Sequence, residues 1–560
     1  MKILVSLYRR QIRHGVPGHI YHRTVFTCVR LLSREQNLKR LSNFFKNEKE
    51  IVSKIRTEFA EPFISIDGLI ENVKDNYPHQ PSKSILLRGV RDGQLHHPAI
   101  PINYIKENVE EIQSNWQNRM PYNERLDILK DVIAPYDRLQ IIRQAKNKYV
   151  SEKDALTKST QDFWIHHREN NESSVPPEIE KDRQKSLNLG CIISLLSWIE
   201  LKLEKLFYEN ALMIPNITHP MVPVGDESAG EVIKTVNEKK KNKYLTYGHM
   251  DAGERTSIIR QKNISNFTGQ RTYYLYKEAA DLEQALVRYT IDRLKDKGFH
   301  MISGSNILHG SAYEGCGITS SKMSELLYHI DSEQEDDFFI TGTSEVSIAA
   351  FCANHAILHK HLPLKLCCVS TCNRKETRSS IDRRGIYRVH HFTKVEMFAV
   401  TANETEKESE ELFNEFLQIQ EELFTDLELH FRIVNMATEE LGLPAHQKVD
   451  MEAWMPTKNG YGEISSTSNC TDFQSRRLHI LYKNENGNYK FAHTVNGTAC
   501  AVPRMIIALL ENNQSEDKVI TLPKVLHPYL QKTTIDRSSR LNMEYIGPNQ
   551  SKSKWKMPNE

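Results

Sequence analysis

The chain has 560 residues, of which 39% are hydrophobic and 26% are charged, and its formal net charge is +2. This is the composition of a soluble globular protein, with room for about two to four domains. The small net charge excludes a strongly polyanionic or polycationic chain, although basic residues can still cluster locally. No stretch has about 18 consecutive apolar residues, so we expect no spanning helix and no membrane partner. The nine cysteines are scattered and no secretory signal precedes them, which indicates reduced thiols.

The first 40 residues are basic. They hold nine Lys or Arg, and the first acidic residue is Glu35. Such a start predicts a mitochondrial transit peptide over 1–40 with an unreadable cleavage site, the alternative being a basic surface helix or tail. Residues 41–135 follow and contain seven prolines. The short apolar clusters between these prolines predict a few short helices and loops that pack on a larger domain.

Residues 136–213 are predicted to form a helical hairpin. In their second part the apolar residues recur at spacings of 4, 3, 4 and 3, which is a coiled-coil seam: Ile192, Leu196, Ile199, Leu203 and Leu206. A weaker pattern precedes it, through Leu139, Ile142, Tyr149 and Leu156. The polar stretch RENNESSVPPEIE separates the two parts, and its prolines suit the start of a second helix. Two helices in an ordinary bundle are the alternative.

A proline-rich linker, 214–230, leads into a domain predicted over 214–535. Helix 279–297 is predicted to end at Gly298, a C-cap residue, and the last helix spans 501–514. Strand-like runs lie at 365–377, 387–400, 431–437, 449–457, 461–468 and 490–496. Several of these runs are joined by loops too short for crossover helices, which indicates an antiparallel sheet and an α+β fold class. A lysine-bearing tail, 536–560, follows.

Two common kinds of site have no support in the sequence. No G-x-x-x-x-G-K-S/T loop is present, and no G-x-G-x-x-G follows a strand. Three cysteines, Cys367, Cys368 and Cys372, lie near three histidines, but their spacing fits no standard zinc pattern. Cysteines in a strand are more typical of a core.

The stretch 370–398 is predicted to be a hairpin of two strands around a basic loop, 378–384. Side chains alternate between faces, so Arg374 and Glu376 share one face of the first strand. On the return strand Phe392, Lys394 and Glu396 share a face, and Phe392 and Glu396 lie about 13 Å apart. That distance suits the two ends of one elongated ligand. Taken alone, the hairpin is better explained as a polar strand face with ion pairs.

Three distant stretches change this interpretation. Thr343 and Glu345 precede an apolar helix in TGTSEV. Glu463, followed by Ser465 and Ser466, offers oxygen ligands of the kind that divalent cations prefer. Farther along, Thr498 is predicted in a turn, and Arg504 begins an apolar helix. Arginines, acids and hydroxyls in this combination indicate a site for a nucleoside triphosphate.

Together these segments resemble the seryl-tRNA synthetases, a family of class II aminoacyl-tRNA synthetases, and most closely their animal mitochondrial branch. The resemblance covers about residues 185–550 through six stretches: IPNITHPMVPVGD, TGTSEV, NRKET with RGIYRVHHFTKVEMF, GEISSTSNCTDFQSRRL, HTVNGTACAVPRMIIALLENNQ and YIGPNQ. It implies an antiparallel class II catalytic domain with an N-terminal coiled-coil arm. It also implies a homodimer in the mitochondrial matrix that attaches L-serine to a mitochondrial tRNA(Ser) with ATP and Mg²⁺.

The resemblance also implies roles for single residues. L-Serine is expected at Thr343, Ser344, Glu345, Glu396 and Thr498. ATP is expected at Arg374, Lys375, Glu376, Val389, Phe392, Glu463, Ile464, Ser465, Ser466 and Arg504. Arg374 and Arg504 would be catalytic, and Glu463 with Ser466 would hold Mg²⁺.

The sequence departs from the family pattern in three places. Asn373 stands where many members have an aromatic residue, Pro503 stands where glycine is common, and residues 41–135 align with nothing. A non-catalytic paralogue that binds RNA or proteins is the alternative function, and such a chain would be expected to lose motif residues.

Overall fold

The computed structural model of the protein describes residues 83–123, 127–169, 175–238, 246–331, 337–376, 385–536, 541, 543, 545 and 546. The predicted transit peptide, the first half of segment 41–135, the basic loop 378–384 and most of the predicted tail lie outside the described residues. The described chain divides into two compact units. One comprises residues 133–207, and the other comprises residues 83–132 together with the chain from Tyr208 onward.

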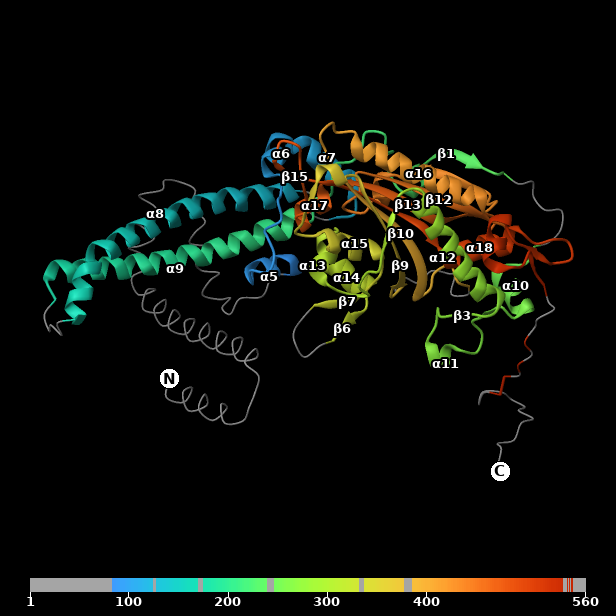
Figure 1. Cartoon of the computed structure of the whole chain (residues 1–560). Helices are drawn as coiled ribbons and strands as arrows, with labels where there is room; N and C mark the ends of the chain where they lie inside the picture. Colours follow the sequence, from blue (N-terminus) through green and yellow to red (C-terminus); the bar gives the residue numbers. More distant parts are fainter. Residues whose placement is uncertain are drawn as a thin grey trace, which may run out of the picture. The chain divides into compact units, whose positions relative to one another are not determined.

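Two long helices, α8 (Ile128–Glu169) and α9 (Pro177–Ala211), form the predicted hairpin. Figure 1 shows them running alongside each other, and their buried side chains make one cluster. Its core residues are Leu139, Ile142, Ala145 and Tyr149 on α8 and Leu189, Ile192, Leu195, Leu196, Ile199 and Leu203 on α9. Arg143 crosses between the helices to Glu200 at 3.0 Å and Glu204 at 2.9 Å, which helps to fix their pairing.

The hairpin differs from its prediction at two points. Leu206, predicted on the seam, is 44% exposed, whereas Phe207 is buried, because the stripe continues with a spacing of four from Leu203. The first helix begins at Ile128 rather than at 136 and runs through Pro135. Proline has no N–H and leaves the carbonyl four residues earlier without its helical donor. Asn210 Nδ2 donates to that Asp131 carbonyl at 3.3 Å.

Helix α9 is the one helix among the described residues that is long and apolar enough to cross a membrane by length and composition. We expected none, because the sequence has no uninterrupted apolar run of that length. The apolar side of α9 packs on α8, as hairpin helices do.

The second unit is built on an eight-stranded sheet in the order β1-β11-β12-β13-β16-β10-β9-β4. All neighbours are antiparallel except β4 and β9. The strands are β1 (Glu231–Val236), β11 (Phe431–Asn435), β12 (Gln447–Met455), β13 (Gly460–Thr471), β16 (His493–Ala501), β10 (His391–Thr401), β9 (Leu364–Asn373) and β4 (His300–Ile302). The predicted antiparallel α+β fold is therefore confirmed.

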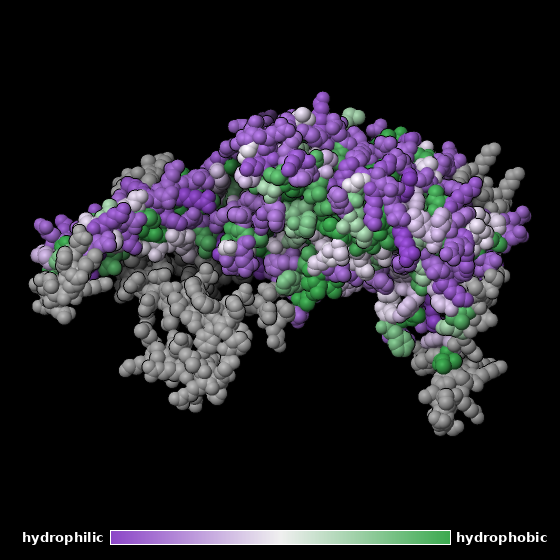
Figure 2. Space-filling view, in the orientation of Figure 1, coloured by the Kyte–Doolittle hydropathy of each residue, from purple (hydrophilic) through white to green (hydrophobic). Residues whose placement is uncertain are grey.

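Three long helices cover one face of this sheet: α12 (Glu278–Asp296), α16 (Glu408–Asp426) and α18 (Val502–Asn512). Their apolar sides share the main core with the strands. Helix α16 buries residues at helical spacing, such as Leu412, Phe416 and Leu423, and its outer side lies in a largely hydrophilic surface (Figure 2). As predicted, α12 is followed by Gly298, whose φ of +84° is the left-handed conformation that ends many helices.

The side chains of β10 show that the face of the sheet away from α12, α16 and α18 carries both a second core and a pocket. Val395 and Met397 point into the main core. On the opposite face Phe398 lies in a second core with α13 (Gly310–Gly315) and α15 (Ser344–Cys352), while Lys394 and Glu396 line a pocket. The alternation of side chains along one strand therefore separates the site from both cores. The cysteines 367, 368 and 372 of β9 are buried.

The described part of segment 41–135 forms α5 (Ile85–Arg91), α6 (Ile102–Glu107) and α7 (Val109–Arg119). These are the short helices that the sequence predicts, and they pack on the sheet-containing unit. Glu314 of α13 accepts hydrogen bonds from Ser84 Oγ at 3.0 Å and from the Leu86 N–H at 2.8 Å. A carboxylate therefore caps the first N–H groups of α5.

Candidate active site

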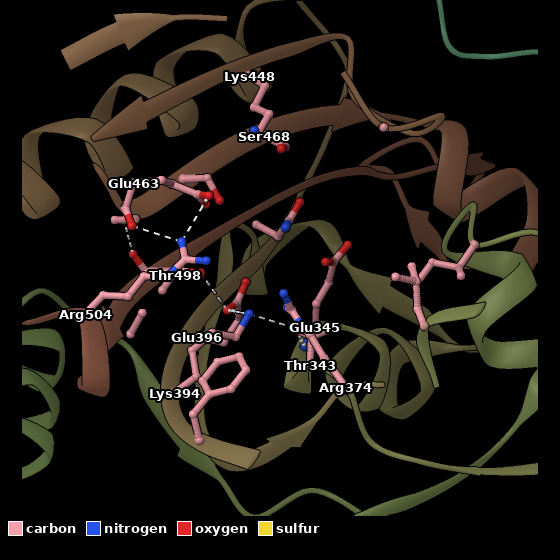
Figure 3. A pocket seen from close by; sticks show the side chains of 18 of the residues that line it. Thr343, Glu345, Arg374, Lys394, Glu396, Lys448, Glu463, Ser468, Thr498 and Arg504 are labelled. Carbon is pink, nitrogen blue, oxygen red and sulfur yellow. Dashed lines mark hydrogen bonds and ion pairs between the residues drawn. The ribbon is translucent and has the colours of Figure 1, made fainter. Parts of the chain in front are cut away.

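The pocket lies on the face of the sheet opposite to α12, α16 and α18 (Figure 3). Of the residues predicted from the sequence it is lined by Thr343, Glu345, Arg374, Glu376, Val389, Phe392, Glu396, Glu463, Ile464, Ser465, Ser466, Thr498 and Arg504. Ser344 and Lys375 do not line it. Stretches separated by more than a hundred residues therefore meet in one cavity.

One end of the pocket is built from the N-terminus of α15 and from the strands β10 and β16. Thr343 is the N-cap of α15 and accepts a hydrogen bond from the Glu345 N–H at 3.3 Å. Thr498 lies on β16 rather than in the predicted turn, and α18 begins only at Val502. A bulge at Ala499 sets Thr498 opposite Glu396, to which its hydroxyl donates at 3.2 Å.

A buried lysine joins the groups at this end. Lys394 Nζ lies 2.5 Å from Glu396 Oε2 and donates to Thr343 Oγ1 at 2.8 Å. Gln474 Nε2 donates to Glu345 Oε1 at 2.8 Å, so Glu345 and Glu396 both have protein donors. The sequence placed Lys394 on the correct strand face but gave it no role.

The charges at this end do not balance. Two carboxylates, the buried Glu396 and the partly buried Glu345, face one ammonium, that of Lys394. Burial and then Glu396 raise the pKa of Glu345 to about 7, although Lys394 and Arg374 act in the opposite direction. A ligand with a positive group relieves this imbalance, since an added cation favours the ionised form of both acids.

Two arginines of the pocket stack on aromatic rings, Arg504 at the other end and Arg374 beside Gly342 and Thr343. Arg504 pairs with Glu463 at 3.0 Å, and its guanidinium lies 4.5 Å from the centre of the Tyr387 ring. Arg374 lies 5.3 Å from the centre of the Phe392 ring. In Figure 3 Arg504 and Glu463 lie on one side, and Thr343 and Glu345 lie on the other. One end of the pocket therefore holds Glu345 and Thr343 with the Arg374 guanidinium beside them, and the other end holds the Arg504 guanidinium and Glu463.

The hairpin around Arg374 departs from its predicted geometry. Strand β9 ends at Asn373 and β10 begins at His391, so Arg374 and Glu376 lie beyond the strand instead of on it. Glu376 has a φ of +47°, which breaks the alternation. It still lines the pocket, 3.9 Å from Arg388. The Arg374 N–H donates to the His390 carbonyl at 2.9 Å and thereby closes the base of the loop.

A second bulge, at Ile464 in β13, decides which hydroxyls reach the pocket. Because of this extra residue, Ser466 and Glu463 lie on one face although they are three positions apart. Ser465 lies among the lining residues, but its hydroxyl donates to the Thr498 carbonyl and accepts from Gln420 of α16, behind the sheet. Its predicted contact with the nucleotide is therefore restricted to its backbone.

The two predicted residues outside the pocket have other positions. Lys375 Nζ donates to the Ser324 carbonyl at 2.9 Å and so points away from the site. Ser344 is 1% exposed in the first turn of α15. Pocket residues that the sequence did not single out include Lys322, Tyr387, Lys448, Ser468 and Asn496. Ser468 and Asn496 could have been found from strand alternation with Ser466 and Thr498.

A divalent cation fits the oxygen groups of the pocket only in company with a ligand. Glu463 lines the pocket with Ser466 and Ser468, and Asp450, the partner of Ser466 across β12 and β13, is paired with Lys448 at 2.8 Å. Burial raises the pKa of Glu463, whereas Arg504 and Lys448 bring that pKa below its usual range. In the described part of the chain no three His, Cys, Asp or Glu residues gather in a way that could hold a metal. Mg²⁺ commonly takes one or two carboxylates, several waters and substrate phosphates, and this donor set fits that pattern.

This antiparallel sheet, with an acidic pocket end and stacked arginines, defines a class II aminoacyl-tRNA synthetase core. Residues 328–513 match the model of the "tRNA synthetase class II core domain (G, H, P, S and T)". The mitochondrial serine–tRNA ligase of Mus musculus is 42% identical over 422 residues, which are 75% of this chain and 81% of that protein. The chain belongs to the serine–tRNA ligase family.

Solved structures agree with this assignment. Seryl-tRNA synthetase from Pyrococcus horikoshii, complexed with ATP, has a TM-score of 0.69 at 30% identity and covers 78% of this chain and 98% of its own. The cytoplasmic serine–tRNA ligase from Naegleria fowleri, in complex with AMP, has a TM-score of 0.66 at 28% identity. The match covers 79% of this chain and 99% of that chain. Both structures cover more of this chain than residues 328–513.

Proposed function

We propose that this chain is a mitochondrial serine–tRNA ligase. It activates L-serine with ATP to seryl-adenylate and transfers the seryl group to the 3′ end of tRNA(Ser). The observation that carries this proposal is the arrangement of charges in the pocket: Glu345 lies at one end with the ion pair of Glu396 and Lys394, Arg374 lies beside Gly342 and Thr343, and Arg504 lies at the other end. A zwitterionic amino acid and a nucleoside triphosphate together complement these charges.

At the acidic end, Glu345 and Thr343 receive the ammonium of serine, with Ser344 adding its backbone. Glu396 and Thr498 receive the hydroxyl. An alanine would leave these buried polar groups without a partner, which a site of this kind rejects strongly. Threonine adds a methyl group, and its rejection comes from the size of the pocket.

Arg374, whose Nε donates to the Gly342 carbonyl next to Thr343, binds the α-phosphate, and Arg504 at the other end binds the γ-phosphate. The adenine ring stacks on Phe392 and is bounded by Glu376, Val389 and the backbone of Lys375. The backbone of Ile464 and Ser465 completes the wall. Both arginines are held in place by the protein before the ligand binds, and preorganised charges stabilise a transition state without reorganisation cost.

The activation step joins two anions. The serine carboxylate attacks the α-phosphorus in line, the bond from that phosphorus to the pyrophosphate oxygen breaks, and pyrophosphate leaves. The attacking carboxylate is already ionised, so no general base is needed. Glu463 and Ser466 would hold Mg²⁺, which when bound screens the phosphate oxygens.

The remaining parts of the chain support the second step. The hairpin arm, residues 136–213, binds the tRNA, and the basic loop 378–384 reaches its acceptor end. Two protomers form a homodimer through the catalytic domain, 214–535. Residues 1–40 direct the protein to the mitochondrial matrix, which is favoured by the mouse and Bos taurus relatives, both named mitochondrial serine–tRNA ligases.

Serine-dependent exchange of labelled pyrophosphate into ATP tests this function. The purified protein should exchange with serine and far more slowly with alanine or threonine, and Arg374→Ala should abolish exchange in a folded protein. Absence of exchange in the wild-type protein would leave the non-catalytic paralogue as the better explanation. A chain shortened within the hairpin arm should still exchange but should charge tRNA poorly.

A further inference from the structure

Arg119, the last residue of α7, is a buried cation behind the wall of the pocket. It is 3% exposed. Its guanidinium donates to the carbonyls of Asn216 and Ala445, each at 3.1 Å, to Thr218 Oγ1 at 3.2 Å, and to the Gly442 carbonyl. Among the residues that the structure describes, no carboxylate lies within ion-pair distance of this group.

A buried guanidinium without an acid costs solvation free energy, so packing alone does not explain this residue. Burial lowers the pKa of Arg119 to about 10, which still leaves it charged at neutral pH. An apolar side chain of similar volume would fill the space without that cost. What only arginine supplies is a rigid planar fork that donates in several fixed directions.

Arg119 and Asn216 together donate a hydrogen bond to every backbone carbonyl of loop 442–445. Arg119 takes the first and last carbonyls, those of Gly442 and Ala445. Asn216 takes the two between them: its N–H donates to the Leu443 carbonyl and its Nδ2 to the Pro444 carbonyl, both at 2.9 Å. All four carbonyls of loop 442–445 thus accept hydrogen bonds from Arg119 or Asn216.

This loop belongs to the acidic end of the pocket. All four of its residues line the cavity, as do Cys316, Gly317 and Cys470. Pro444 Cδ lies 2.9 Å from the place where a Cβ on Gly317 would stand. Phe473 Cε1 lies 3.1 Å from the same place, and its neighbour Gln474 donates to Glu345 at 2.8 Å, so this wall lies beside Glu345.

We infer that Arg119 is a positioning residue for serine, which holds loop 442–445 against the acidic end of the pocket. The inference rests on the proposed function. It assigns to the segment before the hairpin arm a part in amino-acid binding. If the loop moves, the space around serine changes, while Arg504 and Glu463 at the nucleotide end keep their places.

Arg119→Lys tests this, because lysine keeps the charge but cannot reach both ends of the loop with one planar group. In pyrophosphate exchange by the full chain, we expect the serine KM to rise about tenfold while the ATP KM changes less than about twofold, since misplacement acts on the group it touches. If Arg119→Met folds, it should raise the serine KM further. If it does not fold, Arg119→Lys alone tests the inference.

Arg293→Lys is the matched control, because Arg293 of α12 pairs with Asp426 at 3.2 Å away from the pocket. It should leave both KM values unchanged. An unchanged serine KM in Arg119→Lys, or serine and ATP KM values that rise together, would overturn the inference, even if the thermal midpoint falls. An inactive wild-type protein would instead refute the proposed function on which the inference rests.

Discussion

Lys394 and Glu396 form a buried ion pair, with 2.5 Å between Nζ and Oε2, on the strand that crosses the centre of the site. Their side chains are 8% and 2% exposed. The two residues are two apart on β10, so they share a face, and Thr343 completes the group from α15. This pair sets the charge at the acidic end of the pocket, and the first prediction concerns its removal.

Lys394→Met should destabilise the fold and abolish serine activation. Loss of one partner from a buried pair leaves an uncompensated charge, which costs about 3–5 kcal/mol in the free energy of unfolding. Urea denaturation measures that cost. Adding Glu396→Leu should restore much of the stability, since two apolar groups replace the pair, but should not restore exchange. Equal activity of Lys394→Met and the wild-type protein would show that the pair is not part of the site.

Serine binding should weaken as the pH falls below about 7. The pKa of Glu345 is raised from 4.5 to about 7 by burial and by Glu396, and only its ionised form attracts an ammonium. The serine KM should therefore rise up to about tenfold per pH unit below pH 7. Glu345→Gln should bind serine weakly at every pH and lose this dependence, so a persisting slope in that variant would assign it to another group.

The same group has the opposite effect on stability. A carboxyl with a raised pKa binds its proton more tightly in the folded chain than in the unfolded chain. Between about pH 4.5 and 7 the folded state holds more protons, so Glu345 lowers the free energy of unfolding as pH rises through that window. Ionisation of Glu345 should thus strengthen serine binding and lower the free energy of unfolding. The difference between the wild-type protein and Glu345→Gln measures the contribution of Glu345 to each pH dependence.

Two neighbouring serines offer a matched test of the metal site. Ser466 lines the pocket beside Glu463, whereas the Ser465 hydroxyl faces Gln420 behind the sheet. Ser466→Ala should raise the Mg²⁺ concentration for half-maximal exchange several-fold, because a cation with few protein ligands depends on each. Ser465→Ala should leave that concentration unchanged and cost about 1 kcal/mol of stability from lost hydrogen bonds. The reverse pattern would contradict the bulge geometry.

Most of the fold could be predicted because helices and strands leave patterns in short stretches of the sequence. Apolar spacing predicted both arm helices, and alternation predicted the faces of β10. The sequence did not show that the side chains of Ser465 and Lys375 turn away from the pocket, because one follows a bulge and the other precedes a residue with positive φ. Bulges depend on pairing with a neighbouring strand, which no local pattern reports.

Arg119 shows the same limit more strongly. Its acceptors lie 97 to 326 residues farther along the chain, and a lone arginine at a helix end carries no signal of them. Lys394, by contrast, was on the predicted face, and only its partner Thr343 was distant. Contacts between distant segments are therefore what the structure adds to the sequence.

His249 should control nucleotide binding from outside the pocket. The Ile386 N–H donates to His249 Nε2 at 3.3 Å, so Nδ1 carries the proton and donates to Glu511 at 2.8 Å. This contact fixes the chain just before Tyr387, whose ring and carbonyl receive Arg504. A Cβ on Gly385 would lie only 2.6 Å from His249 Nε2, which shows how closely the chain approaches.

His249→Ala should therefore raise the ATP KM about tenfold, because displacement of Tyr387 moves Arg504 from its preorganised position. The serine KM should change little, since the acidic end has no contact with this segment. Thr457→Val is the control: Thr457 Oγ1 donates to the other oxygen of Glu511 at 2.6 Å and has no part in holding Ile386. It should lower the thermal midpoint and leave the ATP KM unchanged. A similar rise of the ATP KM in His249→Ala and Thr457→Val would mean that Glu511 acts through the packing of α18. His249 would then not position the chain at Ile386 and Tyr387.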